Sequence, residues 1–119
     1  MPAQAGFSKS VRLLDAKAYT FVFDKAQRFN LSAGLYLVRA NSQATARLGL
    51  VVAKKRLNKA VKRNHLKRAQ REHFRLVRPQ LNAYDIVFLA NHHLTKLNRR
   101  QMTLCCVKDW LKLSVLLST

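Results

Sequence analysis

The segment from Asn58 to Pro79 constrains the fold most, because it combines dense basic charge with regularly spaced apolar residues. Its central stretch, "KRNHLKRAQREHFR", holds six Lys or Arg residues and a single carboxylate. When successive residues are placed about 100° apart, as in a helix, the apolar residues fall within about 120°. That side consists of Leu66, Ala69, His73, Leu76 and Val77, and the opposite basic sector consists of Asn64, Lys67, Arg68, Arg71, Arg75 and Arg78. The segment is therefore predicted to be a docked amphipathic helix, capped by Asn58 and ended by Pro79, and not a disordered tail.

The net charge of the chain indicates a polyanionic partner. The 119 residues include 23 Lys or Arg and 5 Asp or Glu, so the formal net charge is +18. With 49% hydrophobic residues, the chain has enough apolar side chains for a packed core, which a disordered polycation lacks. We expect one domain over residues 1–119, with residues 1–10 flexible, and a nucleic acid as the partner that offsets the self-repulsion.

No membrane span or secretory signal is apparent in the sequence. No apolar run approaches the roughly 18 residues that a spanning helix needs, and "MPAQAGFSKSVRLL" lacks the apolar stretch of a signal peptide. Cys105 and Cys106 are adjacent, a spacing that suits neither a disulfide between distant elements nor a zinc-binding pair. Both are expected in the core, and their use favours a reducing, cytoplasmic setting.

The rest of the chain is predicted to supply two more helices and four strands. A first helix is expected from about Asp15, its N-cap, to Ala26. The expected strands are "RFNLS", "GLYLVRA", "RLGLVVA" and "YDIVFLA", the last apolar enough to be covered on both faces. A third helix is expected after about Lys96. The predicted order is helix, three strands, helix, strand, helix, in a single α/β domain.

The basic face of the central helix lacks the acids that a merely solvated helix uses to form ion pairs. Only Glu72 is available, at pairing distance in sequence from Arg68 and Arg75. Arginine outnumbers lysine on this face, which suits bidentate contact with phosphate and stacking on bases. Solvation is the ordinary reason for charge on a helix, but the missing acids favour a nucleic-acid surface.

Catalytic groups are sparse. Asp15 is expected to act as a cap, Glu72 lies among arginines, and Asp24, Asp85 and Asp109 are scattered, so no carboxylate pair indicates a metal site. The adjacent His92 and His93 are expected in a loop, where they contact solvent or at most phosphate. No serine or cysteine nucleophile has a recognisable partner. We therefore expect no catalytic residue and no metal held by the protein.

Several of these motifs together resemble one known family. "KRNHLKRAQREHFR", preceded by "LGLVVAKKRLNKAV" and followed after a short loop by "YDIVFLA", resembles the signature of the bacterial ribonuclease P protein subunit. The segment "RLLDAKAYTFVF" is similar to the opening segment of that family. The resemblance runs from about Val11 to Leu113, with the order and spacing of the motifs preserved.

The resemblance implies a fold and a function. Family members form an α/β (α+β) sandwich of four strands and three helices, ribosomal-protein-S5-like, with a left-handed βαβ crossover that the usual chirality rule would not predict. It further implies that the protein binds a large catalytic RNA and assists removal of the 5′ leader from precursor tRNA. The RNA would carry out the hydrolysis and hold most of the Mg²⁺. No obligate protein partner and no membrane are expected.

The resemblance also assigns residues to a surface for the catalytic RNA. These positions match the basic helix of the family and the basic pair at the end of its third strand: Lys54, Lys55, Arg63, Asn64, His65, Lys67, Arg68, Arg71 and Arg75. His65 departs from the family pattern, which has a second arginine there. A neutral imidazole donates one hydrogen bond or stacks, but it lacks the permanent charge and the fork of a guanidinium.

A second surface implied by the resemblance is a cleft for the single-stranded leader. Tyr19 and Phe23 match its two aromatic positions, with Tyr19 in place of the commoner phenylalanine, and Lys67 and Arg71 match its border. Aromatic rings stack on any base, as binding of a single strand without strong sequence preference requires. The alternative, that both aromatics belong to the core, remains open from their spacing alone. Tyr36 is a further candidate, whose face depends on the register of its strand.

Other functions would share part of this pattern. A ribosomal or RNA-chaperone protein would share the charge but would need no aromatic cleft. A DNA-binding regulator would place "KRNHLKR" in a major groove, but no helix-turn-helix spacing precedes it. A nuclease that acts without RNA is disfavoured by the scattered acids.

Overall fold

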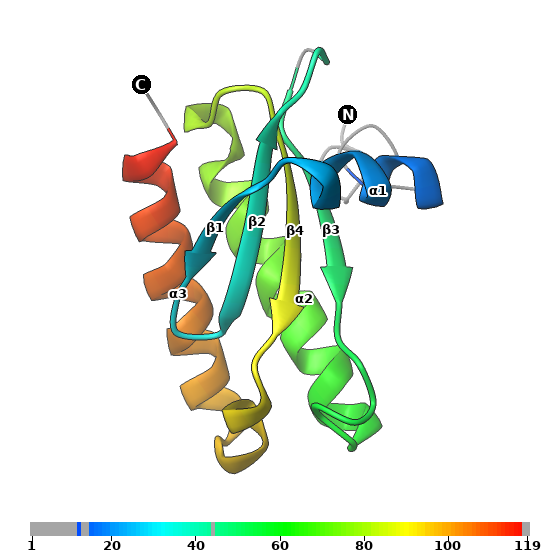
Figure 1. Ribbon diagram of the computed structural model, residues 1–119. Coiled ribbons are helices and arrows are strands. Elements are labelled where there is room, and N and C mark those ends of the chain that lie inside the picture. The colour runs from blue at the N-terminus through cyan, green and yellow to red at the C-terminus, as the bar shows by residue number, and fades with distance from the viewer. Residues whose placement is uncertain (1–11, 13–14, 44, 118–119) are drawn as a thin grey trace, which may run out of the picture.

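The computed structural model describes residues 12, 15–43 and 45–117, so the prediction for residues 1–10 falls outside the described part. The elements follow the predicted order (Figure 1). They are α1 (Ala16–Asp24), β1 (Gln27–Asn30), β2 (Gly34–Ala40), β3 (Arg47–Val51), α2 (Ala60–Val77), η3 (Arg78–Gln80), β4 (Tyr84–Ala90), η4 (His92–Lys96) and α3 (Arg99–Leu116). The predicted α/β fold with four strands and three α-helices is confirmed.

The strands form one mixed sheet in the order β1-β2-β4-β3, with β3 parallel to β4 and the other pairs antiparallel. The helices α2 and α3 cover one face, and α1 lies on the other (Figure 1). In Figure 1, α2 passes behind the sheet, while β3 and β4 both run downward with β4 to the left. The β3–α2–β4 crossover is therefore left-handed, as the resemblance implies and against the usual rule.

Side chains alternate between two apolar clusters, one on each face of the sheet. Tyr36 and Phe88 belong to the main core beneath α2 and α3. Leu37 and Val87 form a smaller cluster with Val22 of α1 on the opposite face. Helices on both faces account for the nearly continuous apolar sequence of β4.

The helix α2 is amphipathic as predicted, but its buried face is rotated from the expected one. Its buried residues are Leu66, Ala69, Gln70 and Phe74, whereas Leu76 is 55% exposed and His73 is only partly buried. The burial of a polar glutamine moves the centre of the face, which a count of apolar residues does not anticipate.

The ends of the helices agree with the sequence in part. Asp15 caps α1, because its carboxylate accepts a hydrogen bond of 3.0 Å from the backbone of Ala18. The N-cap of α2 is Lys59 and not Asn58, and it makes no side-chain cap hydrogen bond. The helix ends at Val77, directly before the 3₁₀ turn that contains Pro79.

A chain of buried polar groups joins the sheet to both long helices. Asp109 of α3 accepts hydrogen bonds from the backbone of Ser32 (2.9 Å) and Ala33 (2.8 Å) and from the Tyr36 hydroxyl (2.8 Å). Gln70 of α2 donates to the same hydroxyl (2.9 Å) and accepts from the Trp110 indole. Burial and the nearby Asp109 raise the pKa of Tyr36 well above its usual value. Every member of this polar network is satisfied.

The cysteines lie on α3. Cys106 is fully buried in the main core, where desolvation and the nearby Asp109 raise its pKa to about 12. Cys105 is partly buried and packs against the same core. The expected core position is confirmed. Among the described residues, no helix has the length and apolar character needed to cross a membrane.

The polar network yields a test of stability. The substitution Tyr36→Phe removes a donor to Asp109 and an acceptor for Gln70 while both partners stay buried, so the free energy of unfolding should fall by about 1–3 kcal/mol. The matched control is Tyr84→Phe, on a half-buried strand residue, with an expected change within about 0.5 kcal/mol. Urea denaturation measures both, and equal losses would show that the network adds nothing specific.

Candidate nucleic-acid interface

The exposed face of α2 carries most of the predicted RNA-binding residues. Asn64 and Arg68 are exposed, and Lys67, Arg71 and Arg75 are partly exposed. Glu72 pairs with Arg75 at 2.6 Å, and this hydrogen bond lowers the pKa of Glu72. The other expected pair, between Glu72 and Arg68, is not among the ion pairs of the described residues. The face therefore presents a cationic row with a single carboxylate in it.

Arg63 is partly engaged in holding the loop that precedes α2. Its guanidinium donates to the carbonyl oxygens of Leu57 (3.1 Å) and Asn58 (2.8 Å). Leu57 is itself buried and anchors the loop in the core. At this position, one guanidinium both positions the loop and presents positive charge.

His65 does not occupy the place of a solvent-facing arginine. Its Nε2 lies 3.0 Å from the carbonyl oxygen of Arg99 and 2.9 Å from the hydroxyl of Thr103. A carbonyl oxygen only accepts, so Nε2 carries the proton when it bonds to Arg99. The side chain therefore joins α2 to the first turn of α3.

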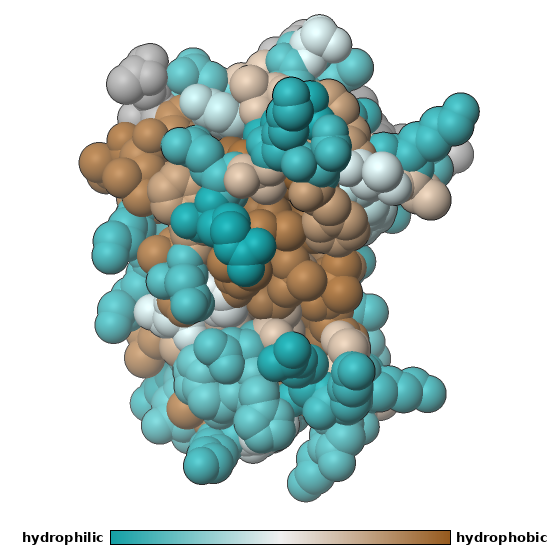
Figure 2. Space-filling model, viewed as in Figure 1, coloured by the Kyte–Doolittle hydropathy of each residue, from teal (hydrophilic) through white to brown (hydrophobic). Residues whose placement is uncertain are grey.

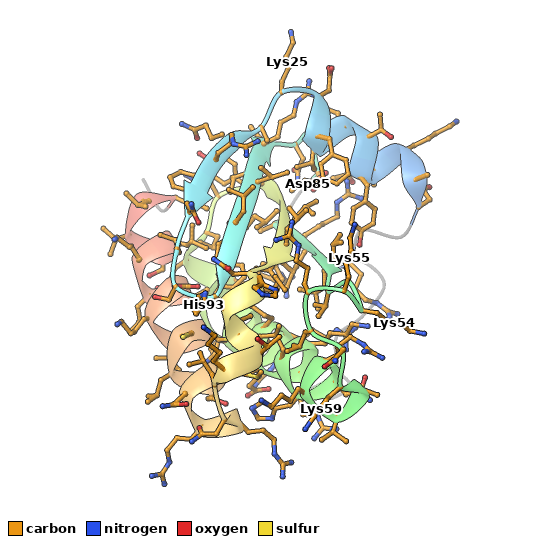
Figure 3. The ribbon with its side chains drawn as sticks, turned by 60° about the horizontal axis from the view of Figure 1, so that its bottom comes forward. Lys25, Lys54, Lys55, Lys59, Asp85 and His93 are labelled. Atoms are coloured by element: carbon orange, nitrogen blue, oxygen red, sulfur yellow. The ribbon has the colours of Figure 1, made fainter. Side chains whose placement is uncertain are left out.

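The predicted basic pair lies in the loop after β3. Lys54 and Lys55 are exposed there (Figure 3). Arg56, which was not among the predicted residues, is exposed beside them. The backbone of Arg56 donates to the carbonyl oxygen of Ala53 at 3.0 Å, which shapes the turn. The loop thus places three cations between β3 and α2.

The opposite face of the sheet carries an apolar groove that α1 leaves uncovered. Its floor is one row across three strands, because Leu89 pairs with both Leu35 and Val51. The residues around this floor are Asn30, Gly34, Ala53, Lys55, Arg56, Ala90 and Asn91. Figure 2 shows hydrophobic side chains in the middle of this face, with hydrophilic ones gathered below them. An apolar floor beside cations suits a polyanion with flat, stacking groups.

The two aromatic residues predicted for the cleft differ in exposure. Tyr19 packs over Gly49, where a Cβ atom would lie 2.7 Å from the Tyr19 hydroxyl, and it belongs to the smaller apolar cluster. Phe23 is 49% exposed, with its ring centroid 6.3 Å from that of Tyr19. Tyr19 is therefore partly a packing residue, while Phe23 offers half of its surface to a partner.

The selection of Tyr36 as a cleft residue is wrong. Tyr36 is fully buried, and its ring packs against Phe88 and Trp110 on the face covered by α2 and α3. Adjacent positions in a strand point to opposite faces, so its neighbours Leu35 and Leu37 face the α1 side instead. Leu35, Val51 and Leu89 are the groove residues that the sequence analysis missed, since nothing distinguished them from core residues.

Charged residues close the sheet face at the other end. The buried carboxylate of Asp85 accepts two hydrogen bonds from Arg47, at 2.9 and 2.7 Å, and this contact raises the pKa of Arg47. The guanidinium of Arg39 lies 3.7 Å from the ring centroid of Phe21. Asp85, which is one of the scattered acids in the sequence, is thus a structural anchor in the fold.

The remaining titratable residues form no recognisable metal centre. His92 and His93 are exposed, but they begin the short 3₁₀ helix η4 and do not lie in a loop as expected. In residues 12, 15–43 and 45–117, no three His, Cys, Asp or Glu side chains are grouped as metal ligands would be.

Comparisons with known proteins agree with these features. A family model described as Ribonuclease P matches residues 7–114. The chain is 40% identical over 115 residues to the ribonuclease P protein component of Methylococcus capsulatus, covering 96% of this chain and 90% of that protein. It is 38% identical over 104 residues to the same component of Proteus mirabilis, covering 87% of each.

Solved structures show the same fold. The RNase P protein of Staphylococcus aureus superposes with a TM-score of 0.77 at 26% identity, covering 89% of this chain and 96% of that one. The RNase P protein of Thermotoga maritima superposes with a TM-score of 0.69 at 25% identity, covering 85% and 96%. Sequence motifs, fold and relatives over most of the length agree, and the chain belongs to the ribonuclease P protein family.

Proposed function

We propose that this protein is the subunit of ribonuclease P that binds the catalytic RNA through α2 and the 5′ leader of precursor tRNA along the groove beside α1. Membership in the family gives the chain a role in tRNA processing, as a component of an endoribonuclease. The observation that supports binding of both RNAs is that two different surfaces, one basic and one apolar, lie next to each other. A nearly acid-free helix face meets the end of an apolar groove at the cations of the β3–α2 loop.

The α2 surface suits a folded RNA. Its exposed and half-exposed residues are Asn64, Lys67, Arg68, Arg71 and Arg75, and the loop adds Lys54 and Lys55. Arginines contact phosphates in bidentate fashion, and neutralising phosphates releases counterions, which favours binding at low salt. We assign these residues and Arg63 to the catalytic RNA, with His65 in a supporting role.

The groove suits a single strand whose bases are free to stack. Leu35, Val51 and Leu89 supply the floor of the groove, and Phe23 supplies an exposed ring on α1, on the same face of the sheet. Lys55 and Arg56 line the same groove, so they could neutralise the phosphates of a strand bound there. By resemblance, Lys67 and Arg71 border this cleft from α2.

The chemistry is assigned to the RNA, together with most of the Mg²⁺. All five acids of the protein have structural roles or stand apart. Asp15 caps α1, Asp85 and Asp109 are buried in hydrogen bonds, Glu72 pairs with Arg75, and Asp24 lies 3.9 Å from Arg39. Metal-assisted hydrolysis by the protein would need carboxylates that face a common point. We place the protein in the cytoplasm, with no obligate protein partner.

Binding to the catalytic RNA should depend on the α2 face. Arg68→Ala and Arg71→Ala should each weaken binding and reduce the slope of log affinity against log salt by about one unit, since each removes about one phosphate contact. A salt titration with the cognate RNA measures the slope. Folded variants that bind like the parent at every salt concentration would contradict the assignment of this face.

The protein without RNA should cleave nothing. Since its carboxylates are engaged elsewhere, the purified chain incubated with precursor tRNA and Mg²⁺ should leave the substrate intact, and adding the catalytic RNA should give cleavage at the mature 5′ end. The same product from rigorously RNA-free protein, fractionating with the chain, would return the chemistry to the protein.

Phe23 should recognise the leader and not the catalytic RNA. Phe23→Ala should weaken binding of precursor tRNA to the assembled enzyme by about 1–3 kcal/mol, the value of one stacked base, and leave mature tRNA unaffected. Phe21→Ala is the matched control, because Phe21 lies on the same helix but stacks against Arg39.

Stability decides between the two roles of Phe23. Because half of its surface is exposed, the Phe23→Ala variant should keep most of its free energy of unfolding. Equal losses of precursor and mature tRNA binding, or a collapse in stability, would make Phe23 a packing residue.

A further inference from the structure

A second group of cations lies where α2 and α3 begin. Both helices start at the same end of the molecule, below the sheet (Figure 1). Arg99 and Arg100 are the first two residues of α3, Lys96 ends the preceding turn, and all three are exposed. Lys59 lies at the start of α2, at the same end (Figure 3). We call Lys96, Arg99 and Arg100 the α3 basic turn.

Hydrogen bonds fix the α3 basic turn against α2. The ammonium of Lys62 donates to the carbonyl oxygens of Thr95 (3.1 Å) and Leu97 (2.8 Å), on either side of Lys96. One turn further along α2, Nε2 of His65 lies 3.0 Å from the carbonyl oxygen of Arg99. The RNA-binding helix thus reaches the α3 basic turn through two of its own side chains.

The first turn of α3 is itself rigidly built. Asn98 and Gln101 form a capping box, with reciprocal hydrogen bonds of 2.8 and 2.9 Å between side chain and backbone. The hydroxyl of Thr103 donates to the carbonyl oxygen of Arg99 at 3.1 Å. The backbone that carries Arg99 and Arg100 therefore has a defined position next to α2.

The charge of this region opposes the stability of the free protein. The N-terminal end of a helix carries a partial positive charge, which favours acids and disfavours cations. Neither α2 nor α3 has an acid in its first turn, and α3 begins with two arginines. Among the described residues, the ion pairs belong to Arg39, Arg47 and Arg75, so none neutralises the α3 basic turn. These cations repel one another in the free protein, and a bound polyanion would remove that repulsion.

We propose that the α3 basic turn extends the RNA-binding surface of α2 and contacts the phosphate backbone of the same catalytic RNA. In this chain the turn also supplies the charge that is missing at position 65. The imidazole of His65 is engaged in contacts with α3, to the carbonyl oxygen of Arg99 and the hydroxyl of Thr103. The first turn of α3 that it contacts carries the exposed Arg99 and Arg100. This inference rests on the proposed function, since it needs the catalytic RNA as partner.

The test compares two pairs of charges on the same helix. Arg99→Gln/Arg100→Gln removes two cations from the α3 basic turn, and Lys108→Gln/Lys112→Gln removes two exposed cations further along α3. With the cognate ribonuclease P RNA, the first variant should lower the slope of log affinity against log salt by about two units, and the second should leave it nearly unchanged. Neither variant should unfold at a lower urea concentration than the parent, because glutamine keeps the helical preference and the lost arginines are disfavoured at the start of α3.

A rescue variant tests the compensation. Adding His65→Arg to Arg99→Gln/Arg100→Gln restores a guanidinium at position 65, so the slope should recover by about one unit. If the triple variant is folded and its salt slope does not recover, Arg99 and Arg100 do not compensate for the missing charge at position 65.

The outcomes separate this inference from the function on which it rests. Equal slopes for the two double variants would overturn the contact with the α3 basic turn, since only total charge would then matter. If Arg68→Ala still lowers the slope in that case, the proposed function stands. A parent protein whose binding to the RNA shows no salt dependence would overturn both.

Discussion

The hydrogen bonds of the Asp109 carboxylate hold the architecture together, because they join three parts of the chain that the sequence separates widely. Asp109 lies on α3 and binds the backbone before β2 and the hydroxyl of Tyr36, which in turn binds Gln70 of α2. A buried carboxylate is costly unless its oxygens are satisfied, so this arrangement tolerates only one placement of both helices on the sheet. Surrounding apolar packing alone would allow each helix to slide by small amounts.

The fixed placement of α2 and α3 determines where the charge of the molecule accumulates. Both helices begin at the same end, and the loop after β3 adds Lys54, Lys55 and Arg56 there. With only five acids in the chain, and two of them buried in structural contacts, little neutralises this end. The cationic surface thus depends both on the number of Lys and Arg residues and on the direction of the two helices, which begin at the same end.

Features of the fold that depend on periodicity and composition could be predicted from the sequence. Features that depend on buried polar contacts between distant residues could not. The order of elements, the cap at Asp15 and the cationic face of α2 follow from local patterns. The burial of Gln70 and the inward position of Tyr36 accompany hydrogen bonds from Tyr36 to Asp109 and from Gln70 to Tyr36, which link residues more than thirty positions apart. No local pattern contains that information. The contact of His65 with Arg99 on α3 was hidden for the same reason.

The groove on the other face exists because α1 is short and seated at one end of the sheet. Tyr19 lies on Gly49, the only residue type that leaves room for its ring, and Val22 packs on Leu37 and Val87. The next row along the strands, Leu35, Leu89 and Val51, lies beyond the helix. A sheet whose strands are apolar on both faces needs a cover on each, and here the second cover is incomplete. The row is therefore only partly buried, and it leaves apolar surface in contact with water on this face.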